Sequence, residues 1–151
     1  MNETPTVHAS AVLAGARALL IRGPAGSGKS RLVLALLEAA QSRLIPFARL
    51  IGDDRVQIDA QYGRLLVRPH ASLAGLIEVR GHGIRRLPYE PVAVVGMVVD
   101  LADAAAQRMP AAETQHTDIS GIRLPRLAVA AGIDPLPPVL AFLATGPLPH
   151  Y

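Results

Sequence analysis

The chain has 151 residues, 50% of them apolar, and a net charge of +3, which suits one compact α/β domain and is too short for two. Because it contains no cysteine, disulfides, thiolate metal ligands and cysteine nucleophiles are excluded, and a reducing cytoplasm is the expected location. No apolar run approaches the roughly 18 residues of a membrane span, and scattered arginines with 3% aromatic residues argue against nucleic-acid binding.

In chain order, the sequence predicts short strands around one longer helix. Two apolar stretches, at residues 7–13 and 18–21, are separated by a turn and predict a strand pair. Apolar residues at helical spacing predict a helix over residues 30–41. The later elements are expected to be strands at 49–52, 56–59 and 64–67, a helical turn at 70–77, a buried central strand at 92–99, strands at 117–119 and 123–127, and a closing helix at 138–144.

One glycine-rich segment, GPAGSGKS, lies between a predicted strand and the longer helix. It fits the pattern G-x-x-x-x-G-K-[ST], in which backbone N–H groups and the positive end of the following helix hold phosphate oxygens. Lys29, the only lysine of the chain, would reach the outer phosphates, and the Ser30 hydroxyl would coordinate Mg²⁺. We call this segment the phosphate loop and expect all its residues to bind ATP: Gly23, Pro24, Ala25, Gly26, Ser27, Gly28, Lys29 and Ser30.

A phosphate-loop enzyme also needs a carboxylate at the end of an apolar strand, near the metal. The chain offers two candidates, the adjacent pair Asp53 and Asp54, and Asp100 after the predicted central strand. Hydrophobicity favours Asp100 as an ordinary metal-binding acid. Adjacent acids at a strand end instead point to opposite sides, so one of the pair could be a base and the other could face a metal or a partner side chain. A solvated Asp-Asp turn is the remaining interpretation.

Four features in a fixed order carry a family resemblance: His8, the phosphate loop, the Asp53-Asp54 pair, and the segment EVRGHGI that starts at Glu78. Over approximately residues 5–130, this set resembles the catalytic domain of the HPr kinase/phosphorylase family, bacterial enzymes that phosphorylate a serine of the phosphocarrier protein HPr. The resemblance implies an α/β fold with a mixed sheet around a single phosphate loop, similar to the nucleotide domain of phosphoenolpyruvate carboxykinase. It also implies that residues 1–151 form one catalytic domain.

The resemblance assigns catalytic roles to four side chains. Asp53 would be the general base that takes the serine proton and, in the reverse direction, the acid that returns it. His8 would lie near Asp53 and the transferring phosphate, Lys29 would reach the outer phosphates, and Arg80 would brace the phosphates or the acidic cluster. Such a site suits phosphoryl transfer, which depends mainly on alignment and charge neutralisation.

The same resemblance implies the cofactors and the partner. The cofactors are ATP and Mg²⁺, with Ser30, Glu78 and Asp54 as metal ligands. The partner is HPr or an HPr-like phosphocarrier in the cytoplasm, and the implied assembly is a homo-oligomer, which is a hexamer in the family.

One stretch departs from the family pattern. Where the family usually shows P-[VI]-x-x-G-R-N, residues 127–134 read LAVAAGID, so Ala130, Ala131 and Gly132 stand in place of the arginine-bearing loop. We therefore expect kinase activity with weak reverse phosphorolysis.

Two other functions fit the motifs. The chain could be a non-catalytic regulatory module that senses a nucleotide or phosphate. It could also be a small-molecule kinase on an ordinary phosphate-loop fold, with Asp100 as its metal ligand. The positions of Asp53 and Asp100 relative to the phosphate loop distinguish this kinase from an HPr kinase.

Overall fold

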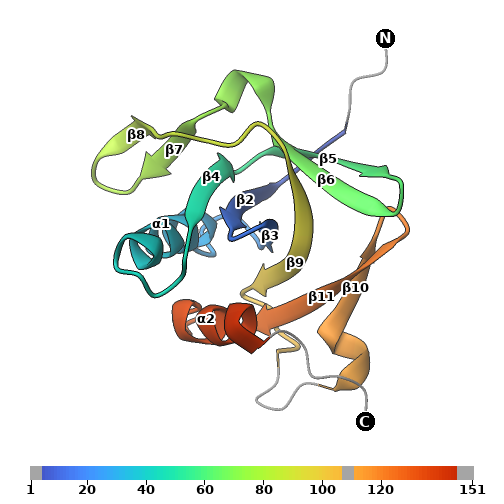
Figure 1. Ribbon diagram of the computed structural model, residues 1–151. Helices are drawn as coiled ribbons and strands as arrows, with labels where there is room; N and C mark the ends of the chain where they lie inside the picture. The colour runs from blue at the N-terminus through green and yellow to red at the C-terminus, as the bar shows by residue number, and fades with distance from the viewer. Residues whose placement is uncertain (1–4, 107–110, 146–151) are drawn as a thin grey trace.

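A mixed sheet of nine strands is the frame of the computed structural model, which describes residues 5–106 and 111–145 (Figure 1). Its strands are β1 (Thr6–Val7), β2 (Ala9–Ala14), β3 (Arg17–Arg22), β4 (Ala48–Gly52), β5 (Val56–Gln61), β6 (Arg64–Pro69), β9 (Ala93–Leu101), β10 (His116–Ile119) and β11 (Ile122–Val129). The other elements are the hairpin of β7 (Leu76–Val79) and β8 (Gly83–Arg86), the helices α1 (Lys29–Gln41) and α2 (Leu136–Thr145), and two 3₁₀ helices at Ala71–Leu73 and Ala112–Gln115. Within the described ranges, no helix is long and apolar enough to cross a membrane.

The central strand of the sheet is β9. It pairs in parallel with β3 and β11 and antiparallel with β6, while β2 pairs antiparallel with both β3 and β4. The strand order β1-β5-β6-β9-β3-β2-β4 thus confirms the predicted mixed sheet. Because β3 and β9 are parallel, Arg22 and Asp100 lie side by side at the C-terminal ends of these strands. The phosphate loop begins at the same end of the sheet.

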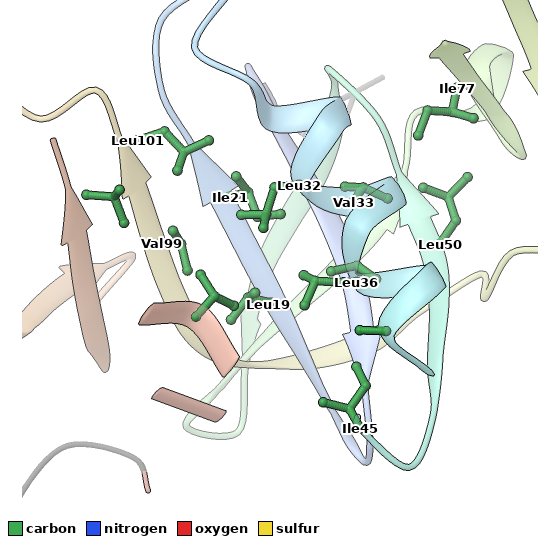
Figure 2. Close-up of a cluster of buried hydrophobic side chains, with 14 residues drawn as sticks. Leu19, Ile21, Leu32, Val33, Leu36, Ile45, Leu50, Ile77, Val99 and Leu101 are labelled. Carbon is green, nitrogen blue, oxygen red and sulfur yellow. The ribbon is translucent and has the colours of Figure 1, made fainter. Parts of the chain in front are cut away.

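Strand alternation gives the sheet an apolar layer on each face. Along β3, Leu19 and Ile21 point to the face covered by both helices (Figure 1), where they pack with Leu32 and Leu36 of α1 (Figure 2). Leu20 points the other way, into a second cluster with residues of β5, β6 and β11. Each buried Leu or Ile contributes about 1.5–3 kcal/mol, so packing against the sheet fixes the position of α1.

Most of the predicted elements are confirmed, including the first strand pair, the helix that follows the phosphate loop and the central strand. The helical turn expected at residues 70–77 is wrong beyond Ala71–Leu73, because Gly75 adopts a left-handed φ of 76° and β7 starts at Leu76. The sequence does not predict β8, since its residues GIRR are exposed along the whole strand and lack an apolar alternation.

Candidate phosphate-binding and catalytic site

Local geometry favours glycine at three positions of the phosphate loop. Gly26 and Gly28 have left-handed φ values of 79° and 99°, a conformation that residues with a Cβ rarely adopt. At Gly23, an added Cβ would lie 2.5 Å from the Ser27 Oγ atom and 3.2 Å from the carbonyl oxygen of Leu101. A larger residue at position 23 would therefore require Ser27 and the end of β9 to shift.

The phosphate loop leads into a helix start that has no cap. α1 begins at Lys29 without a side-chain cap, and its first turn has no acidic residue. Its first N–H groups therefore have no side-chain acceptor, and the helix dipole makes this end positive. The hydroxyl oxygen of Ser27 is also buried with no hydrogen-bond partner in the described part of the chain. Unpartnered polar groups at a positive helix end fit a phosphate group.

Lys29 lies inside the curve of the loop and is only 6% exposed. Its Nζ atom donates to the carbonyl oxygens of Gly23 at 2.8 Å and Pro24 at 3.1 Å. An ammonium has three N–H donors, so one remains for a ligand. The broad planar guanidinium of an arginine needs more room than this enclosed position gives. The curled backbone thus explains why an otherwise arginine-rich chain has a lysine here.

Asp53 lies just after β4, beneath the start of α1, and is 6% exposed. The Ser30 Oγ atom lies 2.7 and 2.8 Å from its two carboxylate oxygens, and Ser10 donates its hydroxyl to Oδ1 at 2.8 Å. Sequence reasoning missed Ser10, which is fully buried on β2. The available signal is that Ser10 is the single polar residue in the apolar run ASAVL, because a buried hydroxyl must find a partner.

Asp54 and His8 form a second, exposed pair next to Asp53. His8 Nε2 lies 2.5 Å from Asp54 Oδ1, with side-chain exposures of 50% and 61%. The backbone N–H of Asp54 donates to Ser10 Oγ at 3.1 Å, so Ser10 contacts both members of the acidic pair. The two neighbouring carboxylates therefore occupy different environments, one buried at the phosphate loop and one open to solvent, as expected at a strand end.

The other predicted site residues lie on the β7–β8 hairpin. Glu78 is exposed on β7 and Arg80 is exposed in the turn that follows. Among the residues that the structure describes, no three histidine or acidic side chains gather as in a metal site. Mg²⁺ usually takes one or two carboxylates together with substrate phosphates and water. The hydroxyl of Ser30 and the carboxylates of the Asp53-Asp54 pair are oxygen donors that fit this preference.

Asp100, the alternative acid, makes a different set of contacts. Arg22 donates from Nε and Nη2 to its two oxygens at 2.6 and 2.8 Å, and Arg126 donates from Nε to Oδ2 at 2.5 Å. Arg126 also pairs with Asp103 and donates to the carbonyl oxygen of Thr114 at 2.9 Å. Both oxygens of Asp100 are thus occupied by guanidinium groups. This arrangement favours Asp53 over Asp100 as the acid that serves the phosphate loop.

The arginines also set the ionisation of Asp100. Burial alone would raise the pKa of this carboxyl group, but the hydrogen bonds and charges of Arg22 and Arg126 outweigh burial and hold the pKa below its ordinary value of 3.8. Asp100 is therefore a permanently charged link between the ends of β3, β9 and β11 at neutral pH.

The fold and the site define a phosphate-loop α/β protein with a mixed sheet and an acidic pair after β4. No protein-family model matches the chain. In sequence, 83 residues, or 55% of this chain, are 35% identical to the HPr kinase/phosphorylase of Mycoplasma mycoides subsp. mycoides, and the match spans 24% of that protein. In structure, the chain is similar to the Hpr(Ser) kinase/phosphatase from Coxiella burnetii, with a TM-score of 0.72 over 93% of each chain and 24% identity. The resemblance to this family, predicted from the motifs, is confirmed, as is the predicted α/β fold with a mixed sheet.

The contacts of Asp100 lead to a prediction about stability. Asp100→Asn should lower the free energy of unfolding at pH 7 by about 1–3 kcal/mol, because two arginines lose their charged acceptor. A lowered folded-state pKa gives stability that is complete above the ordinary value of 3.8 and is lost as the pH falls through the lowered pKa. The difference in the free energy of unfolding between wild type and variant, measured by urea unfolding, should therefore be smaller at about pH 3 than at pH 7.

Asp118→Asn is the matched control. Asp118 is exposed and forms no ion pair within the described residues, so its loss should change stability by less than about 0.5 kcal/mol. A destabilisation by Asp100→Asn that stayed constant down to low pH would contradict the electrostatic explanation.

Proposed function

We propose that this chain is a serine protein kinase of the HPr kinase/phosphorylase type, which transfers the terminal phosphoryl group of ATP to a serine of HPr or an HPr-like phosphocarrier. The observation that carries the proposal is the buried carboxylate of Asp53, within hydrogen-bond distance of Ser30 at the start of α1. The sequence similarity to the Mycoplasma enzyme supports it. Residues 1–151 would act as one catalytic domain, in the cytoplasm and in a homo-oligomer such as the hexamer of the family.

In the forward reaction, the acceptor serine oxygen attacks the terminal phosphorus of ATP while its proton passes to Asp53. The bond between that phosphorus and the bridging oxygen breaks, and ADP leaves. Lys29 and the loop N–H groups offset the negative charge of the phosphates. Ser10 donates to Asp53 and so orients the base, and His8, paired with Asp54, borders the same site.

Mg²⁺ would be held by the Ser30 hydroxyl, with the carboxylates of Asp54 and Glu78 as further ligands, and would neutralise part of the phosphate charge. Arg80, on the same hairpin as Glu78, would add a cation beside the phosphates. Both hairpin residues are exposed and form no ion pair within the described residues.

The activity test combines the purified protein with ATP, Mg²⁺ and HPr, and detects phosphoserine on HPr by mass spectrometry. Formation of phosphoserine supports the proposal. Binding of ATP without any transfer would instead identify a nucleotide-sensing module.

Lys29→Ala should abolish phosphoserine formation, because it removes the charge that meets the outer phosphates. The fold should survive, as judged by circular dichroism, since α1 is held by its apolar face. Lys29→Arg serves as the matched variant and should not restore activity, because the enclosed loop cannot accept the wider guanidinium. HPr phosphorylation at the wild-type rate by Lys29→Ala would show that the phosphate loop is wrongly assigned.

Asp53→Asn should reduce transfer at least about a hundredfold, the lower end of a general base's contribution, while ATP still binds. Asp100→Asn should reduce the rate of transfer much less than Asp53→Asn under conditions where both variants are folded, because Asp100 contacts arginines and not Ser30. Initial rates of phosphoserine formation compare the two. Equal losses, or the reverse order, would favour the ordinary phosphate-loop kinase with Asp100 as metal ligand.

The reverse reaction should be weak. In phosphorolysis, an oxygen of inorganic phosphate attacks the phosphorus of phosphoserine, the serine ester bond breaks, the serine oxygen takes a proton from Asp53 and pyrophosphate forms. Two phosphate groups that repel each other must then meet, which requires additional cations. Arg126 is occupied by Asp100 and Asp103, so it does not replace the arginine lost at residues 130–132.

This expectation is measured by incubating phosphoserine-HPr with the protein and excess phosphate and following pyrophosphate. The forward assay on the same preparation is the control. Pyrophosphate release as fast as forward transfer would show that another cation supplies the missing charge.

A further inference from the structure

A pocket of about 330 Å³ lies at the end of the central strands remote from the phosphate loop. Three arginines line it: Arg17 from the start of β3, Arg64 from the start of β6, and Arg123 from β11. β3 begins at Arg17 and ends at Arg22, just before the phosphate loop, so the length of this strand, roughly 20 Å at about 3.3 Å per residue, separates the pocket from the loop. The pocket is therefore distinct from the candidate active site.

The charges around this pocket are unbalanced. No acidic residue is among its lining residues, and none of its three arginines forms an ion pair within the described chain. Asp118 is opposite Arg123 in the β10–β11 ladder, yet no ion pair joins them. All three arginines are exposed, and a bound anion would be attracted by their combined positive charge.

Three other arginines of the chain are paired with carboxylates. Arg22 and Arg126 share Asp100, and Arg49 pairs with Glu90 at 2.9 Å. Arginines outside the pocket, such as Arg68 on β6 and Arg85 on β8, also form no ion pair within the described residues. What marks the pocket is that three arginines line one space and no acidic residue is among its lining residues.

The backbone is also shaped to seat one of these arginines. Gly96 lies inside the central strand β9, where glycine is unfavourable because it loses entropy and packs no side chain. A Cβ at this position would lie 2.7 Å from Cβ and 3.1 Å from Cγ of Arg17. Gly96 therefore allows the stem of Arg17 to cross β9 and reach the pocket, where Gly96 itself forms part of the lining.

We infer that this pocket is a binding site for a small molecule with two or more negative charges on oxyanion groups, such as a phosphate ester or a polycarboxylate. Guanidinium forks bind phosphate and carboxylate through paired, charge-assisted hydrogen bonds. The volume is at the lower end of the about 300–1,000 Å³ of small-molecule sites, and Leu65, Val95 and Leu124 give it an apolar floor. The inference does not depend on the proposed kinase activity.

Glycine amides make the site observable by ¹⁵N NMR of the full chain. Gly63 and Gly96 line the pocket, whereas Gly26 and Gly28 belong to the phosphate loop, so their resonances report the two sites separately. Titration with inorganic phosphate in one series and citrate in another should shift the pocket glycines saturably. The anion that gives the lower dissociation constant at these resonances shows whether the pocket prefers phosphoryl or carboxylate groups.

Charge-removing variants test whether the arginines carry the binding. Arg64→Gln and Arg123→Gln should each weaken binding at the pocket glycines at least about tenfold, as expected for loss of a charge-assisted hydrogen bond. Arg85→Gln, on exposed β8, removes the same charge away from the pocket and should leave the affinity unchanged. Retained dispersion of the amide spectrum confirms that each variant is folded.

Shifts confined to Gly26 and Gly28, or no saturable shift with either anion, would overturn the inference. Equal weakening by Arg85→Gln would do the same, because it would mean that net charge and not the pocket attracts the anion.

Discussion

The site depends on one buried interaction, the carboxylate of Asp53 held between two hydroxyl groups beneath the start of α1. A buried charge is costly unless it is hydrogen-bonded and faces positive charge. Ser10 from β2 and Ser30 from α1 supply the hydrogen bonds, while the dipole of α1 supplies positive charge at the helix start. Because these groups come from different elements, satisfying Asp53 fixes the strand pair β2–β4 relative to the phosphate loop.

The parallel pairing of β3, β9 and β11 places a second set of charges at the same edge of the sheet. Asp100 links Arg22, which precedes the phosphate loop, to Arg126 on β11, so it holds the entry of the loop against the end of the sheet. The two acids therefore have separate tasks. Asp53 contacts Ser30 at the start of α1, and Asp100 is fully used in binding two strand ends together.

Sequence patterns predicted those parts of the molecule that depend on neighbours along the chain. The phosphate loop follows from its own glycines and the helix behind it, and the central strand follows from its apolar run. The choice between Asp53 and Asp100 could not be made in this way, because it depends on Arg126 arriving from a strand that follows β9 in the chain. Ser10 was missed for the same reason, since its role appears only when β2 pairs beside β4.

The two ends of β3 show how one strand can serve opposite electrostatic purposes. Buried apolar residues fill its centre, and an arginine stands at each end. At the phosphate loop, Arg22 is neutralised by Asp100. The positive charge there comes from Lys29 and the start of α1. At the other end, Arg17 packs against Gly96 of β9 and lines a pocket with two further arginines and no carboxylate. The pairing of β3 with β9 shifts register between Ala18 and Leu19, near the Arg17 end, and the residues that the sheet topology brings alongside also differ between the two ends. The remote pocket is therefore a property of the fold and not of β3 itself.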